Sequence, residues 1–220
     1  FSLKQWQLER VIFPLGALTK ADTRDVAREC QLKTAEKEES MEICFVPDKD
    51  YGKFLESAQL ATRHRGDIVD VHGRKLGEHV GLSFYTLGQR QGLGIGGVKA
   101  KGAQRGGGEH APWFVARKDM QTNTLWVVQG HDHPWLLSST LKFEDASWIA
   151  GDAPAHQRCV AKTRYRQQDA VCQYGPMDAQ SHSLRFEQPQ WAVTPGQSAV
   201  MYDGEVCLGG GVIVSKENPA

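Results

Sequence analysis

The sequence has 220 residues, of which 40% are hydrophobic and 24% are charged, proportions that are typical of a chain with a folded core. Lysine plus arginine and aspartate plus glutamate both number 26, so the chain is not strongly basic as a whole. Binding to nucleic acid would therefore depend on local basic patches. No apolar run reaches the roughly 18 residues of a membrane helix, and the first residues do not resemble a signal peptide, so a cytoplasmic location without membrane contact is expected.

Helical spacing dominates residues 1 to about 60. Apolar residues recur at helical intervals over residues 3–12, and Pro14 with the residues after it ends this pattern. Thr19, with Asp22 three residues later, is a plausible N-cap for a second helix that runs to about Leu32. Because the chain starts at Phe1 without methionine, we expect it to be a fragment of a longer protein.

From Gly66 the hydrophobic period changes to two, which is typical of strands. Residues 67–71 and 74–77 flank a His72-Gly73 turn and predict a hairpin. After Pro112, strand signals recur at short intervals and predict a small antiparallel β-barrel. The strands expected there are residues 113–116, 124–129, 158–166, 170–174, 183–187, 199–202 and 205–214.

Glycine is concentrated in residues 85–108, and a phosphate-binding loop is one hypothesis for such a segment. Residues 85–97 fit neither the dinucleotide fingerprint nor the Walker pattern, so we interpret them as a close-packed turn or a loop that faces RNA. The basic, glycine-rich continuation through residues 99–110 indicates a loop that is mobile or is ordered only against a partner.

Five cysteines, at positions 30, 44, 159, 172 and 207, contain no CxxC pair and match no zinc spacing. His131 and His133 lack a third ligand at a recognisable spacing, so no metal site is expected. Cys44 lies among apolar neighbours after an acidic loop. From the residues alone it is either a buried structural thiol or a reactive one, and the reactive role needs positive groups from elsewhere in the fold.

The clearest electrostatic feature is the segment 158–166, which holds four cations and no acid. On a strand, Arg158, Lys162, Arg164 and Arg166 would share one face, while Tyr165 would point away unless the strand ends there. Such a basic stripe suits a phosphate backbone. An ordinary solvated strand face is the alternative, and the residues leave both open.

Several short motifs occur in one order along most of the chain. They are residues 42–45 (EICF), 77–81 (GEHVG), 85–94 (YTLGQRQGLG), 162–166 (KTRYR), 194–199 (TPGQSA) and 204–211 (GEVCLGGG). In this order they resemble the tRNA-specific 2-thiouridylases, the MnmA family. The loop 99–110 is longer and richer in glycine than the family pattern, and Met41 and Glu42 stand where many members have small residues.

The resemblance implies a multi-domain α+β fold. Residues 1–60 would be the helical tail of an α/β catalytic domain, 61–133 a small β-rich central domain, and 134–220 a C-terminal antiparallel β-barrel. The nucleotide-binding domain with its pyrophosphate loop would lie upstream and be missing, so ATP, with magnesium, would be bound there and none by this fragment, which alone would be inactive.

The resemblance also implies an activity and its residues. The enzyme would replace the C2 oxygen of the wobble uridine in glutamate, glutamine and lysine tRNAs with sulfur, after ATP adenylates that oxygen. Cys44 would carry the persulfide and form a disulfide with a cysteine of the missing domain. Arg164, Tyr165 and Gln197 match positions expected to touch tRNA. A sulfur-relay protein would be the donor.

Two other classes of function compete with this one. A non-catalytic RNA-binding module would share the central and barrel domains, and the upstream coding sequence would distinguish it. A thiol oxidoreductase is disfavoured by the absence of a CxxC pair.

Overall fold

The computed structural model describes residues 1–38, 46, 51–58, 63–96, 111–165 and 167–218. Cys44 and its neighbours, the loop 99–110 and Arg166 lie outside the described residues. The chain divides into two compact units, one formed by residues 6–60 and the other by residues 1–5 together with 61–220. Each unit is described by itself.

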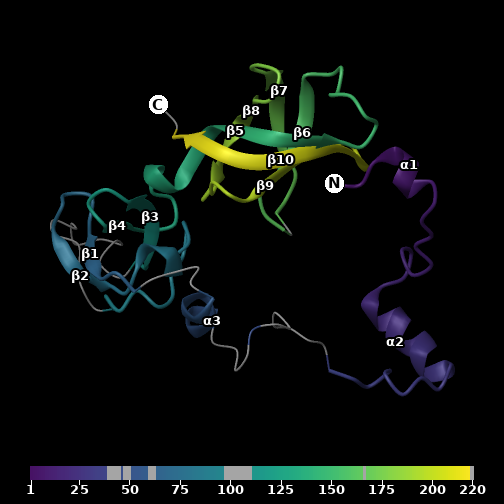
Figure 1. Ribbon diagram of the computed structural model, residues 1–220, viewed down its shortest axis with the longest axis horizontal. Helices are drawn as coiled ribbons and strands as arrows, with labels where there is room; N and C mark the ends of the chain where they lie inside the picture. The colour runs from purple at the N-terminus through teal and green to yellow at the C-terminus, as the bar shows by residue number, and fades with distance from the viewer. Residues whose placement is uncertain (39–45, 47–50, 59–62, 97–110, 166, 219–220) are drawn as a thin grey trace. The chain divides into compact units, whose positions relative to one another are not determined.

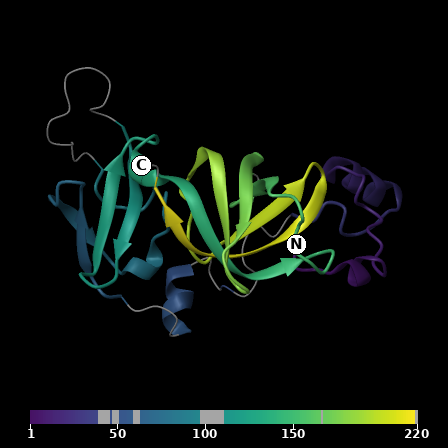
Figure 2. The ribbon, with the colours of Figure 1, turned by 90° about the horizontal axis from the view of Figure 1, so that it is seen from above.

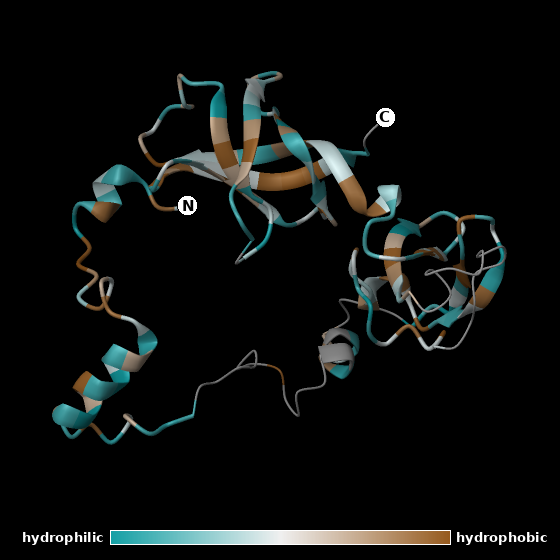
Figure 3. Cartoon of the chain, turned by 180° about the vertical axis from the view of Figure 1, so that it is seen from behind, coloured by the Kyte–Doolittle hydropathy of each residue, from teal (hydrophilic) through white to brown (hydrophobic). Residues whose placement is uncertain are grey.

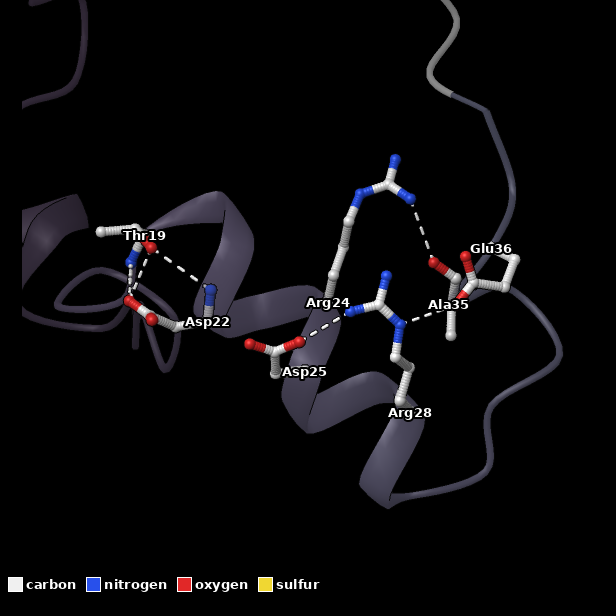
Figure 4. Close-up of polar contacts among 7 residues, drawn as sticks. All are labelled: Thr19, Asp22, Arg24, Asp25, Arg28, Ala35 and Glu36. Carbon is white, nitrogen blue, oxygen red and sulfur yellow. Dashed lines mark hydrogen bonds and ion pairs between the residues drawn. The ribbon is translucent and has the colours of Figure 1, made fainter.

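The first unit contains the helices expected in the N-terminal segment. α2, Lys20–Glu29, begins at Thr19, whose side chain accepts a hydrogen bond from the Asp22 amide at 3.2 Å, while the Asp22 carboxylate accepts one from the Thr19 amide at 2.9 Å. This reciprocal capping box satisfies backbone donors that a helix start leaves open, and it confirms the predicted N-cap. Figure 4 shows these contacts. α3 spans Tyr51–Ser57.

α2 is held to the segment that follows it by its arginines. Nε of Arg28 lies 2.6 Å from the Glu36 carboxylate, and Nη1 lies 2.6 Å from Asp25 (Figure 4). Arg24 donates to the carbonyl of Ala35 at 3.1 Å. These bonds fold residues 35–37 back along the helix, so the unit has local order that does not depend on a buried face of α2.

The first expected helix is shorter than its apolar pattern indicates. α1 covers only Gln5–Leu8. The amides of Arg10 and Val11 bond to the carbonyls of Gln7 and Leu8, three residues back, so the chain tightens into turns instead of continuing the α-helix. The prediction of a helix through Ile12 was therefore wrong.

A four-stranded sheet forms the first part of the second unit. Its strands are β1 (Gly66–Val69), β2 (Lys75–His79), β3 (Trp113–Asp119) and β4 (Thr124–Gln129), in the order β2-β1-β4-β3, with β1 and β4 parallel (Figure 1). The predicted β1–β2 hairpin is confirmed, and buried Asp70 shapes its turn by accepting from the amides of His72 and Arg74. A 3₁₀ turn, η2 (Leu82–Phe84), packs into the same core.

The rest of the second unit is a closed antiparallel barrel. Its strands are β5 (Leu137–Trp148), β6 (Arg158–Lys162), β7 (Ala170–Pro176), β8 (His182–Trp191), β9 (Ser198–Asp203) and β10 (Val206–Glu217), in the order β10-β5-β8-β7-β6-β9 (Figure 2). The core is filled by inward residues such as Leu141, Phe143, Leu184, Met201 and Ile213. A short 3₁₀ turn, η3 (Pro134–Leu136), leads into β5.

Hydrophobic and hydrophilic residues alternate along the barrel strands, as Figure 3 shows. This alternation is the period of two from which the barrel was predicted, and the barrel is confirmed. The α+β description holds only in part, because the described residues contain few helices and are mostly β, with one mixed sheet beside the barrel.

The three glycines at 209–211 make the close strand packing of the barrel possible. A Cβ atom added at Gly209 would collide with the Ser147 carbonyl, and one at Gly211 would collide with that of Glu144. One at Gly210 would meet the backbone of Ala199, on the other neighbouring strand. β10 therefore approaches both β5 and β9 at distances that only glycine permits.

Candidate nucleic-acid interface

A groove of about 760 Å³ opens where β6 ends and β9 begins. The turn after β6 supplies Thr163, Arg164 and Tyr165, and the turn before β9 supplies Gln197. Lys162, Thr86 and Tyr202 complete much of the wall. The structure thus brings together the three residues that the sequence predicts as tRNA contacts.

The turn after β6 is fixed by a polar clamp. The amide and hydroxyl of buried Thr163 both donate to Oε1 of Gln167, at 2.9 and 3.0 Å. Gln167 in turn donates to the Gln190 side chain at 2.6 Å. Because this clamp bends the chain immediately after Lys162, Tyr165 projects outward with 91% of its side chain exposed. A ring in that position presents a face on which a nucleobase can stack.

Arg164 points into the protein instead of into solvent. Its Nη2 atom donates to the carbonyls of Leu87 and Ala192, each at 2.9 Å, and its guanidinium lies 5.2 Å from the centre of the Trp191 ring. Burial lowers the pKa of the guanidinium. Since Leu87 lies between β2 and β3 of the sheet and Ala192 directly follows β8 of the barrel, Arg164 links the two parts of the second unit.

Gln197 is held by its backbone. Its amide donates to the Thr194 carbonyl at 3.2 Å, and its carbonyl accepts from the Ile213 amide at 2.8 Å. Its side-chain Oε1 is buried and has no hydrogen-bond partner among the residues that the structure describes, and the same is true of Nε of Arg164. A buried polar atom without a partner costs about 1–3 kcal/mol. Both residues line the groove, but neither atom is exposed to solvent, so a polar ligand would satisfy them only after the side chains rearrange.

The strand expected over residues 158–166 ends at Lys162, and of the two interpretations left open for it, a basic stripe is not continued by Arg164. Arg158 pairs with Glu187 at 3.1 Å, and Lys162 pairs with Asp169 at 3.1 Å. The strand ends at Lys162, so the inward-turned Arg164 does not extend the same face, and Arg166 lies outside the described residues. The neutralising acids come from β8 and from the segment before β7, which the composition of one segment does not reveal.

The glycines of residues 85–96 lie in turns. Gly88, with φ +80°, donates to the Val115 carbonyl at 2.7 Å, and a Cβ atom there would meet the ring of Trp191. Gly92 and Gly94 also have positive φ. Close packing is thus confirmed at Gly88, while a Cβ atom at Gly94 or Gly96 would meet no atom within 4 Å, and the alternative of a loop that faces RNA stays a prediction.

The remaining candidate sites are limited. Among the described residues, no three His, Cys, Asp or Glu side chains gather as a metal site would require. Cys30 is exposed, Cys207 is half-buried, and Cys159 and Cys172 are buried together. Of the helices in the described part of the chain, none is long and apolar enough to cross a membrane.

Three family models match the chain in succession. They are a tRNA methyl transferase HUP domain over residues 1–48, a tRNA methyl transferase PRC-barrel domain over residues 52–129, and an aminomethyltransferase β-barrel domain over residues 138–213. The second range covers the four-stranded sheet and the third covers most of the barrel.

Curated relatives are similar along almost the whole chain. The tRNA-specific 2-thiouridylase MnmA of Paracidovorax citrulli (strain AAC00-1) is 60% identical over 213 residues, which cover 97% of this chain and 56% of that protein. The MnmA protein of Acidovorax ebreus (strain TPSY) is also 60% identical, over 97% of this chain and 57% of its own length. This chain thus spans a little over half the length of these relatives. Over the residues that it spans, the chain belongs to the family of tRNA-specific 2-thiouridylases.

Proposed function

We propose that this chain is part of a tRNA 2-thiouridylase and that the groove beside Tyr165 binds the tRNA. The observation that carries the proposal is the convergence of Arg164, Tyr165 and Gln197 in one groove, in a chain that is 60% identical to proteins named for this activity. The tRNAs would be those for glutamate, glutamine and lysine, and the enzyme would act in the cytoplasm.

The groove suits a single-stranded or splayed segment of RNA. The exposed Tyr165 ring offers a stacking face, which is typically worth about 1–3 kcal/mol per base. Gln197 and Arg164, which line the groove and each hold a buried polar atom without a partner among the described residues, would contact polar base edges after their side chains rearrange. The ammonium of Lys162 lies 3.1 Å from Asp169 and 5.4 Å from the centre of the Tyr202 ring. On binding, Lys162 would exchange the Asp169 carboxylate for a phosphate of the RNA backbone.

The sulfur chemistry is assigned to Cys44, which lies outside the described residues. A sulfur-relay protein would load this cysteine with a persulfide. The terminal sulfur would then form a bond to C2 of the adenylated wobble uridine, the bond from C2 to the activated oxygen would break, and AMP would leave with that oxygen. A cysteine in the part of the enzyme that this chain does not span would reduce the sulfur–sulfur bond and form a disulfide with Cys44.

ATP and magnesium would bind outside the described residues. Gly92 and Gly94 lie in turns, and no helix begins in the described residues 93–96, so within that range they lack the helix N-terminus on which a phosphate loop depends. In this proposal residues 1–60 belong to the catalytic domain, 61–133 form the central domain and 134–220 form the barrel domain. The sheet and the barrel fall within the last two ranges, which supports the division.

The activity is tested with Cys44→Ser in the full enzyme, with Cys30→Ser as the matched control because Cys30 is an exposed thiol. We expect the Cys44 variant to bind tRNA with unchanged affinity and to form no 2-thiouridine, measured by mass spectrometry of digested tRNA. The Cys30 variant should retain the activity. Thiolation by the Cys44 variant would remove the cysteine from the mechanism.

The competing function, a non-catalytic RNA-binding module, predicts a different result. In that case the full protein would bind tRNA but form no 2-thiouridine even with every cysteine intact and a persulfide donor present. Binding should also weaken steeply with salt, because displaced counterions accompany every phosphate contact. Absence of tRNA binding at low salt would contradict both functions.

A further inference from the structure

A second group of cations lies where the sheet and the barrel meet. The guanidinium of Arg117, on β3, lies 3.9 Å from the centre of the Trp135 ring in η3. η3 runs directly into β5, and its last residue, Leu136, accepts from the Ala192 amide at 2.6 Å. Ala192 is also the residue whose carbonyl binds Arg164. One short segment therefore brings Arg117 and Arg164 to the same junction.

Lys216 joins them from the end of β10. It lies opposite Leu141 of β5, a few residues after η3, and its side chain is half-buried. Burial lowers the pKa of the Lys216 ammonium, and the positive charges of Arg117 and Arg164 lower it further. We call Arg117, Arg164 and Lys216 the junction cluster.

The junction cluster is not neutralised by the protein. Among the residues that the structure describes, none of its three members forms an ion pair. The other barrel cations discussed above, Arg158 and Lys162, each have a carboxylate partner. Arg117 contacts η3, Arg164 binds the Ala192 carbonyl beside it, and the charges of both act on Lys216. Their mutual repulsion would be relieved by a bound anion.

We propose that Arg117 and Lys216, together with Arg164, bind the phosphate backbone of the tRNA as a second contact site beyond the groove. The proposal rests on the proposed function, since it requires that RNA occupies the groove. Arg164 lines the groove and its charge also acts on Lys216, so this residue connects the groove with the cluster. The Trp135 ring packs against the Arg117 guanidinium, and the N–H groups at the edge of the guanidinium would donate to phosphate oxygens.

The test measures binding of an unmodified glutamate tRNA transcript to the full enzyme at several salt concentrations. The variants are Arg117→Ala with Lys216→Ala, the charge-preserving pair Arg117→Lys with Lys216→Arg, and Arg185→Ala as an exposed cation on β8. We expect the alanine pair to bind about tenfold or more weakly and to lower the salt slope by roughly 1–2, one contact per cation. The charge-preserving pair should stay within about threefold of the parent protein, and Arg185→Ala should match it.

The outcomes separate this proposal from the proposed function. If Tyr165→Ala weakens binding while the alanine pair changes neither affinity nor slope, the junction cluster is not a phosphate site and the groove still is. If the parent protein binds no tRNA, both are wrong. An equal loss with the charge-preserving pair would indicate a packing defect and overturn the electrostatic role.

A second measurement avoids substitution altogether. Lys216 of the parent enzyme is acylated with an amine reagent, with and without saturating tRNA, and Lys142 on β5 serves as the reference lysine in the same digest. The tRNA should slow acylation of Lys216 several-fold more than that of Lys142. Equal rates with and without tRNA would overturn the proposal, as would protection by an acidic peptide but not by tRNA, which would assign the cluster to a protein partner.

Discussion

The guanidinium of Arg164 lies over the Trp191 ring, 5.2 Å from its centre, while Nη2 of the same arginine binds the carbonyls of Leu87 and Ala192. This arrangement gives one side chain two tasks. Its terminal nitrogen and its flat face join the sheet to the barrel, and its buried Nε atom has no partner among the residues that the structure describes. A residue proposed to touch RNA is thus also a structural link.

Replacing Arg164 by alanine should therefore destabilise the fold as well as weaken RNA binding. The two hydrogen bonds run from a charged donor to backbone carbonyls at a partly buried site, and we expect a loss of about 1.5–3 kcal/mol in the free energy of unfolding. Urea denaturation measures it. Arg158→Ala is the matched control, because its ion pair with Glu187 is exposed and should contribute about 0–1 kcal/mol. Equal losses for the two variants would contradict the structural role of Arg164.

Tyr165 should show the opposite behaviour. With 91% of its side chain exposed, Tyr165→Ala should change the free energy of unfolding by less than about 0.5 kcal/mol. The loss of a stacking face should weaken tRNA binding by about 1–3 kcal/mol, or roughly 5- to 150-fold. Tyr165→Phe keeps the ring and should bind almost as well as the parent protein. If the phenylalanine variant binds as poorly as the alanine variant, the hydroxyl and not the ring is what the RNA contacts.

The elements that the sequence predicts well are those whose signal is local. β4 coincides with the predicted strand at residues 124–129, and the capping box of α2 follows from Thr19 and Asp22 alone. β5, the strand that pairs with both β8 and β10, was not predicted. Its start, Leu137–Thr140, holds three polar residues in a row, and the buried alternation of Leu141 and Phe143 begins only after them.

The candidate site depends on contacts between distant residues, which is why local patterns describe it only in part. The segment 158–166 is basic by composition, yet Arg158 pairs with Glu187 and Lys162 pairs with Asp169. Arg164 instead donates a hydrogen bond to the Leu87 carbonyl. Gln197 entered the prediction through the family resemblance, and its place in the groove follows from the pairing of Gly196 and Gln197 with Ile213. No local sequence pattern predicts that the Trp191 ring packs against the Arg164 guanidinium.

Cys159 and Cys172 are directly opposite one another on β6 and β7, with their sulfur atoms 3.5 Å apart. Both are buried, and the hydrogen bond that they share, together with burial, holds the pKa of the Cys172 thiol well above its ordinary value. We therefore expect iodoacetamide at neutral pH to modify Cys30 in the native protein and to leave this pair intact until urea unfolds the barrel. Mass spectrometry of the digest reports each thiol, and rapid native alkylation of Cys172 would show that the barrel opens at β6 and β7.

His182 should make the stability of the barrel depend on pH. Its ring is packed against Phe143 and Trp148, and its Nδ1 lies 3.0 Å from the Tyr174 hydroxyl. Burial lowers the pKa of the imidazole, although Asp178 partly opposes this shift. The folded protein thus favours the neutral ring, whereas the unfolded chain takes up a proton near the ordinary pKa of about 6.5.

The sign of the effect follows from this difference. The contribution of His182 to stability is complete above about pH 6.5 and is lost as the pH falls through the lowered pKa of the folded state. The urea midpoint should therefore decrease between pH 7 and pH 5. The pKa of His133 is lowered as well, by burial and by Arg117, so part of the slope has that origin. His182→Phe, which keeps an aromatic ring, should reduce the slope, and an NMR titration should place the His182 pKa below 6.5. A ring that titrates above that value, or an unchanged slope in the variant, would contradict the assignment.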